Sequence, residues 1–259
     1  MTALTLPDTT FHYDTWGNGE RAALLCLHGG GCAREHFEAL GGAFGAERRV
    51  VAMDQRAHGE SADAAGPYDV PTLADDAARV VEALSLGPVV VVGHSLGGAV
   101  AESMLEQARV DVRAIVSVDA PLALPAMMAG ALMSLREALL SPERVDEYRA
   151  FMAPMVGFPN DPERAERLLD QLSHFRPAAM AEILASVASY AGGPVLAAHP
   201  NVPVLHIDAG TGVCELDRLR ELRPDAWIGA VVGTRHYPHI ESPEQVAAMM
   251  RHFFGRYDL

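Results

Sequence analysis

The sequence predicts an α/β protein with a mostly parallel central sheet. Short apolar segments rich in valine, leucine and alanine alternate with longer segments whose apolar residues recur at helical spacing. Strands that are apolar on both faces are typical of parallel sheets covered by helices on both sides. The alternation stops near residue 120 and resumes near residue 202. We therefore expect one sheet that is interrupted by an inserted segment.

The first half of the chain supplies most of the expected elements. The predicted strands lie at 11–14, 22–27, 49–53, 88–92 and 112–118, and most of them are apolar runs. The predicted helices lie at 34–40, 72–84 and 99–107. A turn is expected at Gly17-Asn18-Gly19, because glycine and asparagine favour turns.

The second half begins with a run of several helices and then returns to alternation. Prolines are expected to break these helices at Pro142, Pro154, Pro159, Pro162 and Pro177. Strands follow at 202–207 and 226–232, and helices at 215–222 and 243–254. The sequence thus predicts a core of residues 1–120 and 191–259 with a helical cap at 121–190. Six cap methionines form either an adaptable apolar lid or ordinary helix packing: Met127, Met128, Met133, Met152, Met155 and Met180.

Composition narrows the class of protein and of partner. The chain has 259 residues, with 20 basic and 34 acidic residues and a formal net charge of −14. This balance argues against nucleic acid or an anionic membrane as a partner. The sequence shows neither a signal-peptide pattern nor an apolar run long enough for a membrane span. Its three cysteines have no metal-type spacing, and no pattern makes Cys32 a nucleophile, so we expect a cytoplasmic protein.

The stretch Gly93-His94-Ser95-Leu96-Gly97 carries the clearest chemical signal. It lies between an apolar strand and a helix rich in small residues, and there the pattern Gly-x-Ser-x-Gly indicates a nucleophile elbow. The two glycines leave room for a strained turn that lifts the serine hydroxyl clear of the sheet. The helix that follows offers backbone N–H groups to a developing negative charge. Ser95 is therefore the candidate nucleophile.

Four motifs together resemble the α/β-hydrolase superfamily over nearly the whole chain, in that family's order. They are Leu-His-Gly-Gly-Gly at 27–31, Asp-x-Arg-x-His-Gly-x-Ser at 54–61, the elbow at 93–98 and a histidine loop at 233–243. The resemblance implies an α/β-hydrolase fold, with a mostly parallel sheet flanked by helices and an inserted helical cap. It also implies that Asp54, Arg56 and His58 serve as scaffold, and His28 can brace the loop that contains it.

The histidine loop and the glycine-rich loop supply the remaining candidates near Ser95. A serine hydroxyl needs a general base, and His236 matches the family's loop better than the competing His239. The N–H groups of Gly30 and Leu96 can hold the oxyanion that forms when the hydroxyl attacks a carbonyl.

The acid departs from the usual pattern of the family. After the strand that ends at Ile207 most members carry Gly-x-x-Asp, whereas this chain continues Asp208-Ala209-Gly210-Thr211-Gly212. A minority of the family places the acid after the sixth strand, where this chain has Asp119. Triad roles depend on geometry rather than on order in the sequence. Asp119 is therefore the preferred acid and Asp208 the alternative, while Asp119 as a simple helix cap also stays open.

These residues predict a serine hydrolase that cleaves an apolar small-molecule ester or lactone through Ser95, His236 and Asp119. No metal or organic cofactor is implied, and the oligomeric state is open. Two alternatives remain. One is a cofactor-independent dioxygenase or another non-hydrolytic enzyme of the same fold, whose histidine deprotonates an aromatic hydroxyl. The other is a ligand receptor built on this scaffold.

Overall fold

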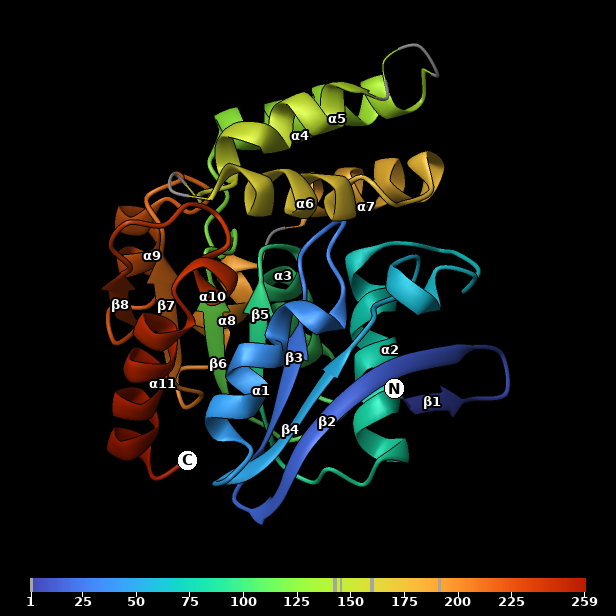
Figure 1. Cartoon of the computed structure of the whole chain (residues 1–259). Helices are drawn as coiled ribbons and strands as arrows, with labels where there is room; N and C mark the ends of the chain where they lie inside the picture. Colours follow the sequence, from blue (N-terminus) through green and yellow to red (C-terminus); the bar gives the residue numbers. More distant parts are fainter. Residues whose placement is uncertain (1, 142–143, 145, 159–160, 191) are drawn as a thin grey trace.

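The computed structural model describes residues 2–141, 144, 146–158, 161–190 and 192–259. At its centre lies an eight-stranded sheet in the order β1-β2-β4-β3-β5-β6-β7-β8 (Figure 1). The strands are β1 (Thr2–Thr5), β2 (Thr10–Glu20), β3 (Ala23–Leu27), β4 (Arg48–Met53), β5 (Val89–His94), β6 (Val112–Val118), β7 (Val204–Asp208) and β8 (Trp227–Ala230). The first two pairings, β1 with β2 and β2 with β4, are antiparallel, and all later pairings are parallel. The mostly parallel sheet that the sequence predicts is confirmed.

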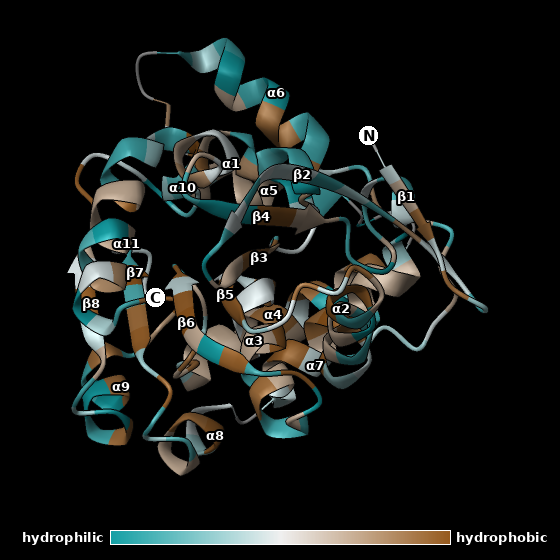
Figure 2. Ribbon diagram, turned by 90° about the horizontal axis from the view of Figure 1, so that it is seen from below, coloured by the Kyte–Doolittle hydropathy of each residue, from teal (hydrophilic) through white to brown (hydrophobic). Residues whose placement is uncertain are grey.

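Helices cover both faces of this sheet. The described α-helices are α1 (Glu38–Phe44), α2 (Val70–Ala83), α3 (Leu96–Gln107), α4 (Ala126–Leu139), α5 (Asp146–Met152), α6 (Pro162–Leu172), α7 (Pro177–Ser189), α8 (Gly193–Ala198), α9 (Leu216–Leu222), α10 (Pro238–Glu241) and α11 (Pro243–Tyr257). Figure 2 shows α1 and α11 on one side of the sheet and α2, α3 and α8 on the other. Within the described residues, no helix combines the length and the apolar character that a membrane span requires.

Each central strand contributes side chains to two separate hydrophobic cores. In β3, Leu24 and Cys26 pack on the side of α1 and α11, while Leu25 and Leu27 pack on the side of α2 and α3. Successive strand residues point to opposite faces, so a strand covered on both sides must be apolar throughout. Burying each large aliphatic side chain contributes about 1.5–3 kcal/mol. The uninterrupted apolar runs of the sequence follow from this packing.

Helices α4 to α7 lie above the carboxyl ends of β5 and β6, where the motifs of the sequence meet (Figure 1). Two of the expected proline breaks are confirmed, because Pro162 and Pro177 open α6 and α7. Pro154 lies in a short 3-10 helix, η4 (Ala153–Met155), directly after α5. The expected breaks at Pro142 and Pro159 lie outside the described residues. The division into a core and a cap at 121–190 stays a prediction.

The predicted turn at Gly17-Asn18-Gly19 is wrong. Strand β2 runs on through these residues to Glu20, and its pairing with β4 shifts register between Trp16 and Glu20. Glycines accommodate such a bulge as readily as a turn, and local composition does not distinguish the two. The sequence also gave no signal for β1, α8 or α10, which are short elements whose stability comes from their neighbours in the fold.

Candidate active site

Ser95 lies in the turn between β5 and α3, at the carboxyl edge of the sheet. Its φ of +49° and ψ of −116° fall in a region that residues with side chains rarely adopt. Ser95 occupies the N-cap position of α3, yet its side chain makes no capping hydrogen bond, so the hydroxyl is not engaged by the helix. A Cβ on Gly93 would overlap the carbonyl of Gly97, and one on Gly97 would overlap that of Leu27. Both glycines are therefore required for this turn.

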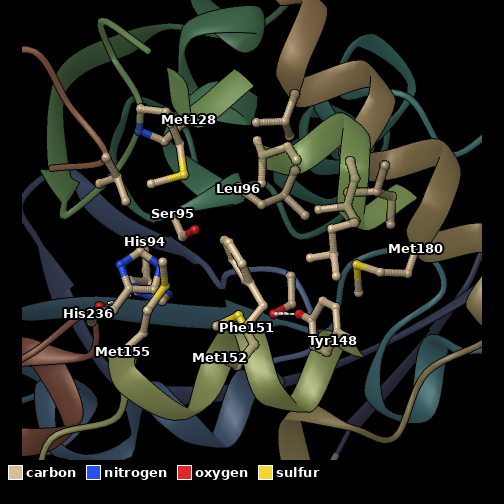
Figure 3. A pocket seen from close by; sticks show the side chains of 18 of the residues that line it. His94, Ser95, Leu96, Met128, Tyr148, Phe151, Met152, Met155, Met180 and His236 are labelled. Carbon is tan, nitrogen blue, oxygen red and sulfur yellow. Dashed lines mark hydrogen bonds between the residues drawn. The ribbon is translucent and has the colours of Figure 1, made fainter. Parts of the chain in front are cut away.

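One pocket brings four of the five predicted site residues together: Gly30, Ser95, Leu96 and His236. Figure 3 shows Ser95 and His236 at one side of this pocket and Met180 at the other. Helices α4, α5 and α7 form most of the remaining wall. Four of the six cap methionines take part, which are Met128, Met152, Met155 and Met180. Met127 is instead 86% exposed and Met133 41% exposed.

The fifth predicted residue, Asp119, is buried beneath the pocket and is hydrogen bonded to His236. The distance between His236 Nδ1 and Asp119 Oδ2 is 2.7 Å. Asp119 also accepts hydrogen bonds from Thr211 Oγ1 at 2.6 Å and from the Ala209 N–H at 3.0 Å. Burial raises the pKa of Asp119, but these hydrogen bonds and the nearby imidazole outweigh it and hold the pKa below its ordinary value. Asp119 is thus arranged to stay a carboxylate.

The alternative acid, Asp208, has no hydrogen bond to His236 in the described structure. Its carboxylate accepts a hydrogen bond from the Gly210 N–H at 3.2 Å. Burial and the neighbouring Asp119 carboxylate raise the pKa of Asp208, which makes it the poorer anion of the two. Of the two carboxyl groups, the structure joins only Asp119 to His236.

The alternative base, His239, does not line the pocket. Its side chain is fully buried and stacks on Phe37, with ring centroids 5.0 Å apart. Neither of its ring nitrogens has a hydrogen-bond partner among the described residues. His239 therefore lacks the hydrogen bond to a buried carboxylate that His236 has.

The two residues whose backbone N–H groups are expected to hold an oxyanion, Gly30 and Leu96, both line the pocket. No hydrogen bond between described residues uses the N–H of Gly30 or of Leu96. The Leu96 N–H is in the first turn of α3, where helices leave N–H groups unpaired. Behind Gly30, Gln55 N–H donates to His28 Nε2 at 3.0 Å, and Gln55 Nε2 donates to the His28 carbonyl at 2.6 Å. His28 braces the glycine-rich loop, as predicted.

The polar motif after β4 connects loops and does not reach the pocket. Arg56 forms hydrogen bonds through Nε and Nη2 with the buried Asp76 carboxylate, at 2.6 and 2.7 Å. Asp54 accepts from the Arg34 and Glu60 N–H groups at 2.8 and 2.9 Å. These contacts are those of scaffold residues, in agreement with the sequence. Burial raises the pKa of Cys32 to about 12, which leaves it a thiol at neutral pH.

Comparison with known families decides the classification of this chain. Residues 24–249 match the profile of a family described as the alpha/beta hydrolase family. The chain belongs to the alpha/beta hydrolase family. The matched range includes the glycine-rich loop, the elbow, Asp119 and the histidine loop.

Three similar proteins illustrate the range of alpha/beta hydrolases around this chain. The 2-(acetamidomethylene)succinate hydrolase of Mesorhizobium japonicum is 27% identical over 240 residues, covering 87% of this chain and 85% of that protein. A thermophilic esterase from Thermogutta terrifontis superposes with a TM-score of 0.84 at 21% identity, covering 99% of this chain and 97% of the other. The enol-lactonase of Burkholderia xenovorans LB400 gives 0.83 at 16% identity, covering 98% and 100%. At these identities the two structures show a shared fold.

Sequence reasoning missed the groups that hold this alpha/beta hydrolase site in place. Thr211 and Ala209 lie in the loop after β7, where most of the family is expected to carry the acid, and here they donate to Asp119. His94 Nε2 lies 2.8 Å from the His236 carbonyl oxygen, which can only accept, so Nε2 carries the proton. The His236 N–H donates to the Met155 carbonyl at 2.9 Å. Of these residues, only Thr211 could have been found from the sequence. It stands at the position where the Gly-x-x-Asp pattern places the acid in most of the family, and its side chain carries a hydroxyl.

A metal site was not expected from the sequence. Across the ranges that the structure describes, no three His, Cys, Asp or Glu side chains gather in a way that could hold a metal ion.

The buried His239 leads to a prediction about stability and pH. Burial, followed by the nearby His36 and His236, holds the pKa of His239 well below its ordinary value, so the folded protein keeps this ring neutral. The unfolded chain binds a proton there below about pH 6.5, and stability is lost as the pH falls, by up to about 1.4 kcal/mol per pH unit. We expect His239→Leu to weaken this loss. The melting temperatures of both proteins at about pH 7.5 and about pH 5.5 measure it.

His174 provides the control, because it is an exposed histidine on the surface of the protein. His174→Leu should leave the wild-type difference between the two pH values unchanged. An equal fall in melting temperature for His239→Leu and the wild type would show that His239 does not contribute.

Proposed function

We propose that this chain is a serine hydrolase that cleaves the carboxylic ester or lactone bond of a small molecule. The observation that carries the proposal is the 2.7 Å hydrogen bond from His236 Nδ1 to the buried Asp119 carboxylate, beside a pocket that Ser95 and His236 both line. A nucleophile, a base and an orienting acid in one place are the parts that acyl transfer requires. The esterase and the enol-lactonase with the same fold agree with this class of reaction.

His236 acts as the general base in this proposal. Because Asp119 accepts the Nδ1 proton, Nε2 of the neutral ring carries a lone pair. No hydrogen bond joins Ser95 Oγ to His236 among the described residues. Such catalytic hydrogen bonds often tighten only when substrate binds. With substrate present, Nε2 accepts the Ser95 proton as Oγ attacks the carbonyl carbon.

The reaction then proceeds in two balanced halves. In the first, the Ser95 Oγ–carbon bond forms, the carbonyl oxygen becomes an oxyanion held by the Gly30 and Leu96 N–H groups, and the alkoxy group leaves with the proton from His236. In the second, His236 takes a proton from water and the hydroxide equivalent attacks the acyl carbon. The bond between Ser95 Oγ and the acyl carbon then breaks, Oγ regains a proton from His236, and the carboxylic acid leaves. Loss of a single oxyanion donor costs about 3–4 kcal/mol of barrier in the best-measured case.

The lining of the pocket supports an uncharged substrate. None of its twenty described lining residues is Asp, Glu, Lys or Arg. A carboxylate taken into such surroundings has no cation to pair with, and an unpaired buried charge costs several kcal/mol. The Mesorhizobium relative, in contrast, is named for a succinate derivative. We therefore propose an apolar ester or lactone as the substrate. The expected partners and the expected cytoplasmic location stay predictions.

A matched pair of esters tests the preference for uncharged substrates. The p-nitrophenyl ester of hexanoate and the mono-p-nitrophenyl ester of adipate differ only in a terminal methyl or carboxylate group. We expect the adipate monoester to have a kcat/KM lower by at least about 10²-fold, because its carboxylate loses water without gaining a partner. Release of p-nitrophenol at neutral pH measures both rates. Values within about tenfold of one another would contradict the proposed substrate class.

The hydrolase itself is tested by turnover of p-nitrophenyl hexanoate together with a phosphonate that traps nucleophilic serines. Turnover and a stable phosphonate adduct on Ser95, identified by mass spectrometry of peptides, are the expected results. The variant that makes this test decisive is Ser95→Ala.

A further inference from the structure

The carboxylate of Glu241 joins two segments that are far apart in the sequence. Glu241 ends α10, and its Oε1 accepts a hydrogen bond from the Gly157 N–H at 3.1 Å. Its Oε2 accepts from the Arg235 N–H at 2.8 Å. Gly157 follows the pocket wall formed by α5 and η4, and Arg235 directly precedes His236. One side chain thus connects the pocket wall to the loop of the proposed base.

The sequence at residue 157 leaves room for this carboxylate. A Cβ on Gly157 would overlap Glu241 Oε2 and would lie 2.9 Å from Arg235 Cγ. Any side chain at this position would push the carboxylate or the histidine loop away. The glycine and the glutamate therefore form a matched pair, although 84 residues separate them.

Two further hydrogen bonds attach the same wall to the site. The His236 N–H donates to the Met155 carbonyl at 2.9 Å. His236 directly follows Arg235, whose N–H donates to Glu241. At the other end of the wall, Tyr148 Oη donates to the Gly30 carbonyl at 3.3 Å (Figure 3). Residues 148–157 therefore contact both the histidine loop and the glycine-rich loop, and they also supply Phe151 and Met152 to the pocket.

We infer that Glu241 is a positioning residue, which fixes the position of the His236 backbone relative to the pocket wall at 148–157. This inference rests on the proposed function, since it assigns Glu241 a role in placing the base His236 against Ser95. A carboxylate suits the task because it offers an acceptor oxygen to each of two N–H groups. An amide of the same shape offers only one.

Glu241→Gln tests the inference, with Glu244→Gln as the matched control. Glu244 lies three residues further on, and its carboxylate accepts from the Ser242 hydroxyl rather than from either segment. For p-nitrophenyl hexanoate we expect Glu241→Gln to lower kcat by about tenfold with KM changed less than about twofold, because small misplacements of a catalytic group are costly. Glu244→Gln should keep wild-type values.

Amide hydrogen exchange supplies a readout that is independent of turnover. In Glu241→Gln, the peptides that contain Arg235–His236 and Gly157 should exchange faster than in the wild type, whereas other parts of the sheet edge should not. If the wild type shows no Ser95-dependent hydrolysis, the proposed function fails, and faster exchange would still support the link between the two segments.

Several outcomes would overturn the inference. A wild-type kcat in Glu241→Gln would do so, and so would an equal loss in Glu244→Gln. If Glu241→Gln does not fold, Gly157→Ala perturbs the same contact from the other segment and should lower kcat by a similar factor. A folded Gly157→Ala enzyme with wild-type kcat and exchange rates would then reject the role of Glu241.

Discussion

Ser95→Ala is expected to lower the kcat for p-nitrophenyl hexanoate by at least about 10⁴-fold. The variant keeps the pocket and the oxyanion donors, but it has no oxygen that can form the acyl-enzyme. The phosphonate adduct should disappear with the activity. Ser103→Ala is the control, because Ser103 is a buried serine on the same helix that does not line the pocket.

The Ser95→Ala variant also separates the proposed hydrolase from its two alternatives. A cofactor-independent dioxygenase would consume oxygen with an N-heteroaromatic substrate, and Ser95→Ala would retain much of that activity. A ligand receptor would bind small molecules without turnover in either form. Rapid hydrolysis that depends on Ser95 would count against both, whereas full ester turnover by Ser95→Ala would reject the proposed nucleophile.

Asp119→Asn is the second change expected to have a large effect, with kcat lower by about 10⁴-fold, as for the acid of the best-measured triad. An amide cannot replace the anion that accepts the His236 Nδ1 proton at 2.7 Å, so the ring loses the tautomer with a lone pair on Nε2. The imidazolium that forms during attack also loses its counter-charge.

Asp208→Asn is the matched control for the acid, since it removes the alternative carboxylate after β7. Its kcat should stay within about twofold of the wild type, because Asp208 has no hydrogen bond to His236. The reverse result, a small effect at Asp119 and a large one at Asp208, would move the acid to the strand where most of the family is expected to carry it. Steady-state kinetics on both variants decides between these positions.

Local patterns were sufficient to predict the fold and the position of Ser95. The elbow depends on residues that are neighbours in the sequence, so its glycines and its small-residue helix are visible in one short stretch. The pairing of His236 with Asp119 is different in kind. It depends on β6 lying beside β7 in the sheet, and the sequence alone left Asp208 open as a second choice.

The contacts of the pocket wall could not be predicted. Tyr148, Met155 and Glu241 reach the site through hydrogen bonds between segments that are far apart in the chain. Two of these bonds use backbone carbonyls as acceptors, which every residue type has, so no sequence pattern marks them. The turn predicted at residues 17–19 failed for a related reason, since only the partner strand β4 shows that these glycines belong to a strand.

The absence of charged side chains from the described pocket lining has a consequence for the end of the reaction cycle. Hydrolysis converts a neutral ester into a carboxylic acid, which loses its proton in neutral water. The product anion finds no cation among the lining residues, whereas bulk water solvates it well. In the proposed reaction, the same lining that admits the ester therefore drives the acid out, and the net charge of −14 on the chain opposes its return. Product should accumulate in solution with little inhibition of the next turnover.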